Sequence, residues 1–348
     1  MAMTTVMSSP GMDMVRVHGP RHVSCDRVEI PIIGDNDVLV RVARCGLCGS
    51  DLGYIAIGGV AAPADAPFGI GHELSGTIEA AGASVRGISV GLRVVVNPMG
   101  DDNIIGNGGP DGGFAPLLRV HNATLGGSIH AIPDDVSFEH AALAEPLAVS
   151  LHAVRRANPS SGSNVAVFGA GPIGLGIVHF LKAAGVARIA VIDLSAGRLK
   201  RARRLGADTL IDASQADVAA ALGDAHGRAE VFGWPTVATD LFFEVSGAAT
   251  VLPSIIAMAP FHARVVMVAV HHAPVPVDWK MALGKELTLT TAMGYPDEFP
   301  AALAAIAAPG FDADALISHR FPLDRFDEAL NAARDRTDSA KVMVACDG

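Results

Sequence analysis

Runs of hydrophobic residues in the first third of the chain are short and alternate with polar positions, a pattern that predicts β-strands. Three such runs lie at residues 37–43 (DVLVRVA), 74–79 and 92–96, separated by stretches rich in Gly, Pro and Asn. Apolar residues at helical spacing are scarce between about residues 13 and 120. We therefore expect a β-rich domain here, with functional groups on its loops.

The hydrophobic pattern changes from residue 163 onwards, where buried-type strands alternate with helices. Residues 164–168 (NVAVF) predict a strand and the apolar run after them a helix, followed by a strand at 188–192, a helix at 196–205 and a strand at 209–211. Further strands are expected at 240–245, 264–270 and 287–291. This alternation predicts a parallel sheet with right-handed crossovers, and six strands suit a doubly wound fold.

The last part of the chain does not continue this alternation. Residues 298–307 and 323–333 have helical spacing, and residues 340–345 are an apolar run typical of a strand. No seventh strand–helix unit is visible, so we expect this tail to pack back on the first domain. The fold class is therefore α/β, with a β-rich domain beside a doubly wound one.

Composition supports a folded protein of two domains and argues against nucleic-acid binding. Of the 348 residues 50% are hydrophobic and 18% charged, so a packed core is expected and disorder is excluded. The net charge of −10 repels phosphate backbones. The basic run at residues 198–204 (RLKRARR) has helical spacing and is expected to be a solvated helix face.

Cysteine usage and the absence of long apolar runs indicate the compartment. Four cysteines are too few for a disulfide scaffold in a chain of this length. No apolar run reaches the roughly 18 residues of a membrane span. The first 14 residues contain neither a basic segment nor a long apolar core. We expect a cytoplasmic protein with reduced thiols and no membrane partner.

A glycine-rich motif follows the strand at 164–168 and opens the next helix. Gly169, Gly171 and Gly174 match the pattern G-x-G-x-x-G, with Ile173 inside it. Gly169 permits the tight turn, Gly171 lets a pyrophosphate approach backbone N–H groups, and Gly174 allows close packing of helix on strand. The helix N-terminus adds a positive dipole. The motif predicts a dinucleotide site; the alternative is a plain glycine-rich turn.

Asp193 ends the next strand, 19 residues after the last glycine of the motif. A carboxylate there accepts hydrogen bonds from ribose hydroxyls and repels a 2′-phosphate, so NAD is favoured over NADP. Arg198 is a candidate for the adenosine side, or else a solvated helix arginine. Val270 ends the fifth strand, at the edge where ligands bind in such sheets, and His271 and His272 follow it.

Three short motifs supply metal-ligating side chains. Cys48 precedes Gly-Ser-Asp in a glycine-rich loop after a strand. His72 and Glu73 follow at a strand start, and Glu145 lies just before the dinucleotide-binding domain. Thiolate, imidazole and carboxylate ligands with one exchangeable position describe a catalytic zinc site. Each motif alone is weak, because a lone Cys is usually a core residue, but their combination upstream of a dinucleotide fold is much stronger.

With these motifs the chain resembles the zinc-dependent medium-chain alcohol dehydrogenases, above all the branch with sorbitol, threonine and 2,3-butanediol dehydrogenases. The resemblance extends over nearly the whole chain: CGLCGSD (45–51), GHE (71–73), GGFA (112–115), ALAEPLAVSLHAV (142–154), GAGPIG (169–174) and KELTLTTAMGY (285–295). It implies a GroES-like catalytic domain with a Rossmann domain inserted before its C-terminal part. We expect a tail at 1–12, the catalytic domain at 13–155 and 293–348, and the NAD-binding domain at 156–292.

The resemblance also implies the zinc ligands. The family's zinc cysteine stands immediately before the Gly of the C-G-S/T-D motif, which makes Cys48 the ligand and Cys45 a structural residue. His72 matches the second ligand. Glu73 and Glu145 match two carboxylates that share the remaining protein position in different members or catalytic states.

Two more residues take roles from the resemblance. Asp51 matches an acid that orients the ligand histidine from behind, and Ser50 matches the hydroxyl that takes the alcohol's proton. The family implies reversible oxidation of a secondary alcohol to a ketone, in which zinc lowers the pKa of the alcohol and hydride passes to NAD. Family habit also implies a homodimer or homotetramer.

The chain departs from the family's pattern in three places. A His that often follows the orienting acid by two residues, and relays the proton outward, is replaced by Gly53. The segment 97–111 lacks the four cysteines that hold a structural zinc in many members, so we expect one catalytic zinc per chain. Gly294 stands where sorbitol dehydrogenases carry a polyol-binding Arg, which, with apolar residues near the site motifs (Ile55, Ile57 and Phe114), hints at a less polar substrate.

Two other functions compete with this one. A zinc-free quinone or enoyl reductase of the same superfamily would lack the Cys48, His72 and Glu145 set. A non-catalytic NAD(H)-binding sensor would have lost these ligands, and Gly53 is the only feature that favours such a sensor. Polyols, vicinal diols, amino alcohols and apolar cyclic alcohols all remain open as substrates.

Overall fold

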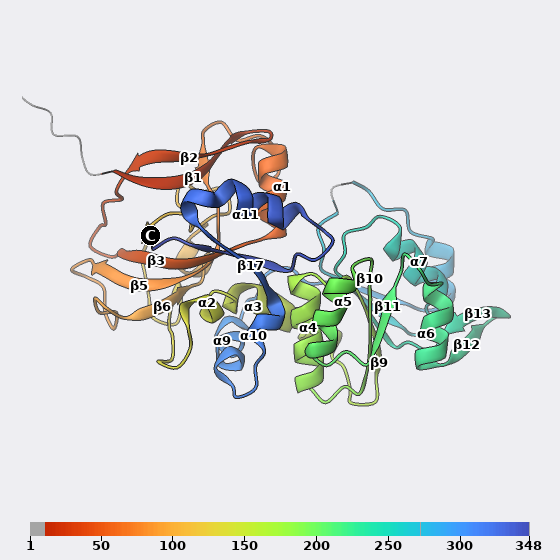
Figure 1. The fold of residues 1–348 in the computed structure, drawn as a ribbon. Helices are drawn as coiled ribbons and strands as arrows, with labels where there is room; N and C mark the ends of the chain where they lie inside the picture. Colours follow the sequence, from red (N-terminus) through yellow and green to blue (C-terminus); the bar gives the residue numbers. More distant parts are fainter. Residues whose placement is uncertain (1–10, 272, 348) are drawn as a thin grey trace, which may run out of the picture.

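The structure is a computed structural model of the chain that describes residues 11–271 and 273–347. Figure 1 shows two parts: a β-rich part on the left, and a parallel sheet with its helices on the right. α3 (Ala144–Ala157) contacts β5 of the first part and β15 of the second. The predicted α/β fold class is confirmed.

The larger sheet of the β-rich part runs in the order β17-β18-β3-β5-β6-β8, and β7 pairs with β3 outside this path. Its pairs are antiparallel except for β17 and β18, which are parallel. The strands are β3 (Val38–Leu47), β5 (Glu73–Ala81), β6 (Arg93–Val96), β7 (Leu117–Val120), β8 (Ile129–Ala131), β17 (Ile317–Pro322) and β18 (Lys341–Ala345). The expected return of the tail to the first domain is thus seen in β18, which pairs with β3.

A second, three-stranded sheet in the order β2-β1-β4 lies beside the larger one (Figure 1). It consists of β1 (Gly11–Gly19), β2 (His22–Glu29) and β4 (Phe68–Gly69). Buried side chains of β1 and β4 join the core cluster that also contains apolar residues of β3, β5 and β7. The two sheets therefore share one hydrophobic core.

The six-stranded sheet is parallel throughout and runs in the order β11-β10-β9-β14-β15-β16. Its strands are β9 (Asn164–Phe168), β10 (Arg188–Asp193), β11 (Thr209–Asp212), β14 (Leu241–Glu244), β15 (Arg264–Met267) and β16 (Thr288–Thr291). The order reverses between β9 and β14, so the carboxyl ends of these two strands flank the crevice where doubly wound sheets bind ligands.

Alternation of side chains explains why helices cover both faces of this sheet. In β9, Val165 and Val167 pack into one core cluster while Ala166 and Phe168 pack into another. The covering helices are α4 (Pro172–Ala183), α5 (Ala196–Arg204), α6 (Val218–His226), α7 (Val251–Met258) and α8 (Trp279–Gly284). A strand buried on both faces reads as the continuous apolar run NVAVF seen in the sequence.

Several of the remaining elements were not predicted from the hydrophobic pattern, among them the hairpin of β12 (Arg228–Val231) with β13 (Trp234–Val237) and the strand β17. The other helices are α1 (Gly49–Ile57), η1 (Gly100–Asp102), α2 (Phe138–Ala141), α9 (Phe299–Ala307), α10 (Ala313–Leu316), η2 (Leu323–Arg325) and α11 (Phe326–Arg334). Within the described residues, no helix is both long and apolar enough to cross a membrane.

The basic run at 198–204 is more than the solvated helix face expected from its spacing. Arg201 Nη1 lies within 3.4 Å of three backbone carbonyl oxygens between residues 314 and 317. Arg204 forms a two-point ion pair with Asp312, at 2.7 and 3.0 Å. The run therefore binds α5 to residues 312–317 near the C-terminus. A local charge pattern does not predict these contacts.

Candidate functional site

Cys48 stands at the junction of β3 and α1, where it is the N-cap residue of the helix. Its backbone N–H donates to Asp51 Oδ2 at 2.9 Å, so an acid in the first turn closes the helix N-terminus. The prediction of a glycine-rich loop is thus wrong from Gly49 on. Because Asp51 caps the helix, α1 begins directly after Cys48. The short helix holds Ser50 and Asp51 rigidly behind the cysteine.

A left-handed turn at Gly71 delivers His72 to the same place. Gly71 has φ of 90°, and a Cβ there would lie 2.6 Å from the Phe114 ring and 2.9 Å from Cys45 Sγ, so only glycine fits. The Gly71 N–H donates to Asp51 Oδ1 at 3.2 Å. The fully buried Asp51 therefore ties the Cys48 turn to the His72 turn, and burial raises its pKa.

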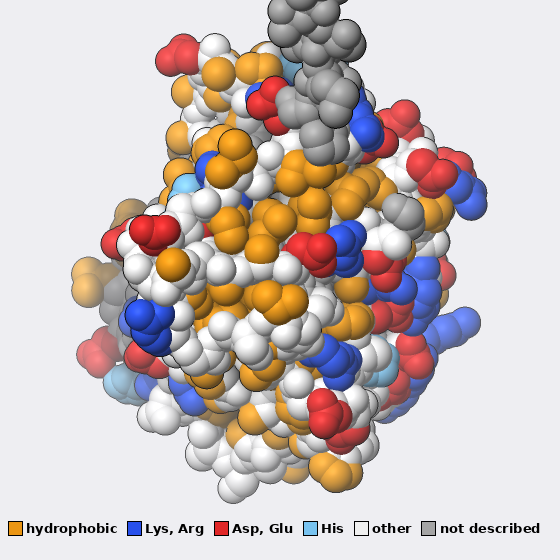
Figure 2. Space-filling model, turned by 90° about the vertical axis from the view of Figure 1, so that its left-hand side faces the viewer, with side chains coloured by type: hydrophobic (Ala, Val, Ile, Leu, Met, Phe, Trp, Pro, Cys, Tyr) orange, Lys and Arg blue, Asp and Glu red, His pale blue; other side chains and the backbone are white. Residues whose placement is uncertain are grey.

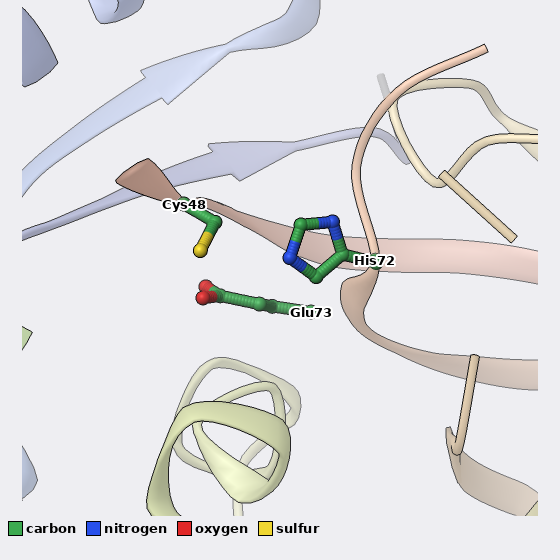
Figure 3. Close-up of side chains that lie close together, drawn as sticks. All are labelled: Cys48, His72 and Glu73. Carbon is green, nitrogen blue, oxygen red and sulfur yellow. The ribbon is translucent and has the colours of Figure 1, made fainter. Parts of the chain in front are cut away.

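Cys48, His72 and Glu73 place a sulfur, a ring nitrogen and a carboxylate oxygen within 4.8 Å of one another. Figure 3 shows the sulfur and the carboxylate pointing toward each other, with a ring nitrogen of His72 facing them. Zinc bonds of 2.0–2.3 Å in a tetrahedron would set such atoms about 3.3–3.8 Å apart, so small side-chain adjustments suffice. The donor set fits a zinc ion.

The two ring nitrogens of His72 face different partners. Nε2 lies 3.3 Å from Ser50 Oγ, and Nδ1 lies 3.6 Å from Asp51 Oδ1. Burial acts to lower the pKa of His72, but the charges of Asp51 and Cys48 outweigh it and hold the pKa well above its usual value. An imidazole backed by a carboxylate is the usual arrangement of a metal-ligating histidine.

A buried lysine that the sequence reasoning missed reaches Glu73 from β18. Lys341 Nζ lies 2.6 and 2.5 Å from the two carboxylate oxygens of Glu73 and donates to Leu47 O at 3.0 Å. Burial acts to lower the pKa of Lys341, but the Glu73 charge raises it. Gly46 makes room for both side chains, since a Cβ there would collide with Glu73 and touch Lys341. Glu73 is thus both near the metal donors and engaged by a cation.

Glu145 comes from the first turn of α3 and is buried close to the same donors. Burial raises its pKa to about 7, against the charge of His72, which acts to lower it. The phenol of Tyr295, which sequence reasoning also missed, is a close neighbour that acts to lower the pKa of Glu145. Glu145 lies outside the group of three donors within 4.8 Å, among the described residues. The structure therefore sets the two carboxylates in different surroundings.

Of the three apolar residues that hint at a less polar substrate, Ile57 is half-buried, and Ile55 and Phe114 are buried. The latter two are 1% and 0% exposed and belong to the core of the β-rich part. Phe114 packs edge-on against Phe326 with ring centres 5.0 Å apart. Both side chains are therefore core residues, and the Phe114 ring packs beside Gly71, next to His72.

The glycine-rich motif joins β9 to α4 as expected. Gly171 is the N-cap residue of α4, and Ile173 lies in its first turn. Asp193 ends β10, next to β9, and its Oδ2 accepts the Ala170 N–H at 2.7 Å while Oδ1 accepts the Ser195 N–H at 2.8 Å. The acid and the glycine-rich turn thus meet at the carboxyl edge of the sheet, as a dinucleotide site requires.

Three further cofactor candidates lie in distinct surroundings. Arg198 directs Nε to Ser339 O at 2.6 Å, so this nitrogen is engaged by the tail. Val270 is 70% exposed beyond the end of β15. His271 Nε2 lies 3.0 Å from Glu244 Oε2 at the carboxyl end of β14, and His272 lies outside the described residues.

The cysteine-free segment 97–111 is held by an aspartate. Asp101 accepts hydrogen bonds from the backbone and hydroxyl of Thr124 and of Ser128, at 2.6–2.9 Å. These donors keep its pKa below the usual value although burial acts to raise it. The segment also reaches the metal motif at residues 71–73, because Asn107 forms a β-bridge with Ile70.

Comparison with known proteins agrees with this geometry. Residues 34–134 match the family model of the alcohol dehydrogenase GroES-like domain, and residues 172–308 match that of zinc-binding dehydrogenases. The chain is 32% identical to (R,R)-butanediol dehydrogenase of Bacillus subtilis (strain 168), over 96% of this chain and 99% of that protein. It is 31% identical to sorbitol dehydrogenase of Homo sapiens, over 95% of each. The crystal structure of 2R,3R-butanediol dehydrogenase from Bacillus subtilis superimposes with a TM-score of 0.84, at 32% identity over 96% of this chain and 99% of that one.

Proposed function

The chain belongs to the family of zinc-dependent alcohol dehydrogenases with a GroES-like domain, and from this premise we propose that its substrates are vicinal diols or polyols. The enzyme oxidises a secondary alcohol to the ketone with zinc and NAD. The observation that carries this function is the convergence of Cys48, His72 and Glu73 donors within 4.8 Å. A zinc-free quinone reductase or a non-catalytic sensor is not favoured, because neither needs this donor set.

When bound, zinc supplies a Lewis acid that lowers the pKa of the alcohol, and NAD supplies the hydride acceptor. Cys48 and His72 would hold the zinc, and Glu73 and Glu145 would share the remaining protein position. Lys341 binds Glu73, and Tyr295 is a neighbour of Glu145, so the two carboxylates have different partners besides the metal. Either carboxylate would therefore be able to supply the third protein ligand of a bound zinc ion.

Ser50 takes the proton of the alcohol, and Asp51 positions the zinc ligands. The Ser50 hydroxyl lies beside the His72 ring nitrogen that faces the donor cluster, which supports its contact with the reacting oxygen. Asp51 is a positioning residue, since its carboxylate accepts the backbone N–H groups of Cys48 and Gly71 and faces His72 Nδ1. It fixes both ligand turns without reaching the substrate.

The dinucleotide would bind at the carboxyl ends of β9, β10 and β15, where its candidate residues lie. Gly169, Gly171, Ile173 and Gly174 form the turn and helix start that receive the pyrophosphate. Asp193 accepts the ribose hydroxyls and disfavours a 2′-phosphate, so NAD is preferred to NADP. Arg198 and Val270 complete this side, Arg198 through the guanidinium nitrogens that Ser339 does not occupy.

A polar substrate is supported by what surrounds the zinc donors. Both tyrosines of the chain, Tyr54 and Tyr295, lie close enough to feel the charges of Glu145 and Cys48. Phenol groups can bond a second hydroxyl of a diol. Ile55 and Phe114, which hinted at an apolar substrate, are core residues. The butanediol and sorbitol dehydrogenases named above also act on such compounds by their names.

The test is NADH formation from two substrate panels, with and without a zinc chelator. One panel holds vicinal diols and polyols such as 2,3-butanediol and sorbitol, and the other holds apolar secondary and cyclic alcohols. We expect chelator-sensitive turnover that is faster on the first panel. Faster turnover of the second panel would contradict the proposal of diols and polyols as substrates. Turnover that the chelator does not reduce would contradict the zinc mechanism. A Cys48→Ala variant that is still active without zinc would do the same.

The division of the chain follows from the same proposal. Residues 13–155 and 293–348 form the catalytic domain with a single zinc, residues 156–292 form the NAD-binding domain, and residues 1–12 are a tail. We place the enzyme in the cytoplasm, which is supported by four free cysteines among the described residues. Limited proteolysis that releases a stable NAD-binding fragment would support these bounds, and zinc analysis above one ion per chain would contradict the metal count.

The proposal includes assembly into a homodimer or homotetramer. Large apolar side chains are exposed around the β12–β13 hairpin and α8: Phe232, Trp234, Trp279 and Leu283 are each at least 67% exposed. Figure 2 shows further patches of hydrophobic side chains between charged ones, on the face that lies at the left of Figure 1. Sedimentation of a monomer at micromolar concentration would contradict this assembly.

A further inference from the structure

The six-stranded sheet consists of two matching halves that meet between β9 and β14. Each half has an inner, a middle and an outer strand: β9, β10 and β11 in one, and β14, β15 and β16 in the other. Each half of such a fold binds one nucleotide of a dinucleotide. Asp193, at the end of the middle strand β10, is assigned to the adenosine ribose. The nicotinamide half of NAD is therefore left to the ends of β14 and β15.

The turn after β14 lies directly against the glycine-rich turn after β9. A Cβ on Gly169 would lie 3.0 Å from the backbone nitrogen of Ser246. A Cβ on Gly247 would lie 3.5 Å from the carbonyl oxygen of Val270, in the segment that follows β15. The residues after β14 and after β15 are therefore neighbours of the turn that would receive the pyrophosphate.

Glu244, the last residue of β14, is a fully buried carboxylate whose two oxygens have different partners. Oε1 accepts the backbone N–H groups of Ser246 and Gly247 at 2.9 and 3.0 Å, and the Ser246 hydroxyl at 2.5 Å. Oε2 lies 3.0 Å from Nε2 of His271, in the segment after β15. Glu244 thus fixes the turn after β14 and, with its second oxygen, the ring of His271.

The contact with Glu244 decides which nitrogen of His271 remains available. A carboxylate accepts hydrogen bonds, so Nε2 carries the hydrogen and donates it. Nδ1 of the neutral ring then keeps a lone pair and can accept. The His271 side chain is 17% exposed, and within the described residues its ring forms a hydrogen bond with Glu244 alone. The ring therefore offers an oriented acceptor beyond the carboxyl end of β15.

The other half of the sheet shows the same arrangement. Asp193 follows the middle strand β10, and its Oδ2 accepts the Ala170 N–H from the turn after the inner strand β9. His271 follows the middle strand β15 and is joined through Glu244 to the turn after the inner strand β14. In each half, an acceptor beyond the middle strand is thus held by the turn after the inner strand. The correspondence favours a ribose as the ligand of His271.

We propose that Nδ1 of His271 accepts a hydroxyl hydrogen from the ribose of the nicotinamide half of NAD, and that Glu244 holds the ring in the tautomer that allows this. This inference rests on the proposed function. His271 is a cofactor-binding residue, and Glu244 is a positioning residue that acts through it. The contact breaks no covalent bond, so it governs the affinity and the orientation of the cofactor.

The first experiment measures the binding of three nucleotides to the zinc-loaded protein by titration calorimetry. ADP carries the adenosine half alone, ADP-ribose adds the second ribose, and NAD adds the nicotinamide. In His271→Gln the amide nitrogen still reaches Glu244, but no atom takes the place of Nδ1. We expect this variant to weaken the binding of ADP-ribose and NAD roughly three- to tenfold, the loss of about one hydrogen bond, and that of ADP less than about twofold. His271→Asn, whose amide oxygen takes the place of Nδ1, should lose less.

The second experiment determines the tautomer of His271 by NMR of the same protein labelled with ¹⁵N-histidine. The chain has 13 histidines, and the His271 signals are assigned as those that His271→Gln removes. At pH 8 without nucleotide, we expect Nδ1 to give the signal of a ring nitrogen that carries no hydrogen. Addition of ADP-ribose should shift this signal, because the second ribose binds to Nδ1, and addition of ADP should not.

Glu244→Gln tests the positioning role separately. The N–H groups of Ser246 and Gly247 would hold the amide oxygen, so the amide NH2 would face His271 Nε2. Nε2 must then accept, and the ring hydrogen moves to Nδ1. We expect the NMR signal of Nδ1 to change accordingly, and ADP-ribose binding to weaken as in His271→Gln. The two changes together should weaken binding no further than either alone, because both remove the same acceptor.

The matched control is Glu286→Gln, which alters a pair of the same kind elsewhere in the domain. Glu286 Oε2 lies 3.6 Å from His262 Nδ1, and the two side chains are 71% and 72% exposed. We expect this variant to bind all three nucleotides like the unmodified chain and to leave the His271 signals in place. A loss of ADP-ribose binding equal to that of Glu244→Gln would overturn the specific role of Glu244.

The outcomes separate this inference from the proposed function. Equal losses of ADP and ADP-ribose binding in His271→Gln would place the histidine at the adenosine or phosphate part and overturn the inference. Unchanged ADP-ribose binding in that variant, or a hydrogen on Nδ1 in the unmodified chain, would also overturn it. An unmodified chain that binds none of the three nucleotides would contradict the proposed function as well. An active chain whose ADP-ribose affinity does not depend on His271 would contradict the inference alone.

Discussion

Replacing Lys341 by Met tests how Glu73 is held between a buried cation and the metal donors. The ammonium lies 2.5 and 2.6 Å from the two carboxylate oxygens, and the side chains are 2% and 1% exposed. Removing one partner of a buried pair strands the other charge and costs about 3–5 kcal/mol. At about 2–4 °C per kcal/mol for a domain of this size, the metal-free variant should melt roughly 6–20 °C lower.

Zinc should reverse part of this loss, because a metal ion can take over the charge of Glu73. We therefore expect added zinc to raise the Tm of Lys341→Met more than that of the unmodified chain. Each tenfold gain in zinc affinity adds about 1.4 kcal/mol of apparent stability. The assay is thermal unfolding followed by circular dichroism, with chelator and then with a zinc series.

The matched control is the double variant Lys341→Met with Glu73→Met, in which the pair is replaced by apolar groups of similar size. Such replacements are often neutral or stabilising, so the metal-free double variant should recover most of the lost Tm but lose the extra response to zinc. A Lys341→Met protein that melts within 2 °C of the unmodified chain would refute the buried-pair reasoning. If added zinc raises the Tm of Lys341→Met and of the unmodified chain equally, Lys341 does not compete with zinc for Glu73.

Three further predictions concern Asp193, Asp51 and His226. Asp193→Ser should weaken NAD binding about tenfold in a fluorescence titration, because a charged acceptor is lost, and an unchanged Kd would contradict its ribose role. Asp51→Asn should lower zinc affinity about 10–100-fold in competition with a chromophoric chelator, since an amide nitrogen must then face an N–H donor or His72; equal affinity would contradict its positioning role. Burial lowers the pKa of His226, whose Nδ1 lies 2.8 Å from Thr239 Oγ1, so below about pH 6.5 the unfolded chain binds more protons than the folded one. Stability should then fall with falling pH by up to about 1.4 kcal/mol per unit from this residue, and His226→Gln should flatten denaturant-measured stability between pH 7 and 5; an unchanged slope would rule this out.

The parts of the site that lie in short motifs could be predicted from the sequence. Cys48, His72 and Glu73 do converge, and the glycine-rich turn does meet Asp193, because each motif sits at a strand end whose place in a sheet follows from the hydrophobic pattern. The parallel six-stranded sheet was predicted for the same reason. Local signals suffice where neighbouring strands bring neighbouring motifs together.

The parts that depend on distant segments could not be predicted. Lys341 lies in an apolar run that marks a strand, but nothing near it indicates that its ammonium reaches a carboxylate 268 residues away. The sequence around Asn107 predicts a loop, and the contact of Asn107 with the metal motif depends on a β-bridge to Ile70. Tyr54 carried a usable signal, since it lies four residues after Ser50 in what proved to be a helix. Reading the segment from Gly49 on as a loop hid that spacing.

The pairing of β18 with β3 also has a consequence for how the protein is made. The residues from Cys48 to Glu73 emerge from the ribosome early, and the whole six-stranded sheet is synthesised before Lys341 follows. Domains generally fold as units, so the sheet is completed only when β18 emerges, although the donor residues are already exposed to zinc while Glu73 still lacks its cation. Zinc that arrives in this interval meets a carboxylate with no competitor, whereas zinc that arrives later must displace an ammonium. The timing of metal supply relative to translation therefore decides the path by which the enzyme matures, and β18 is the strand that ends the interval.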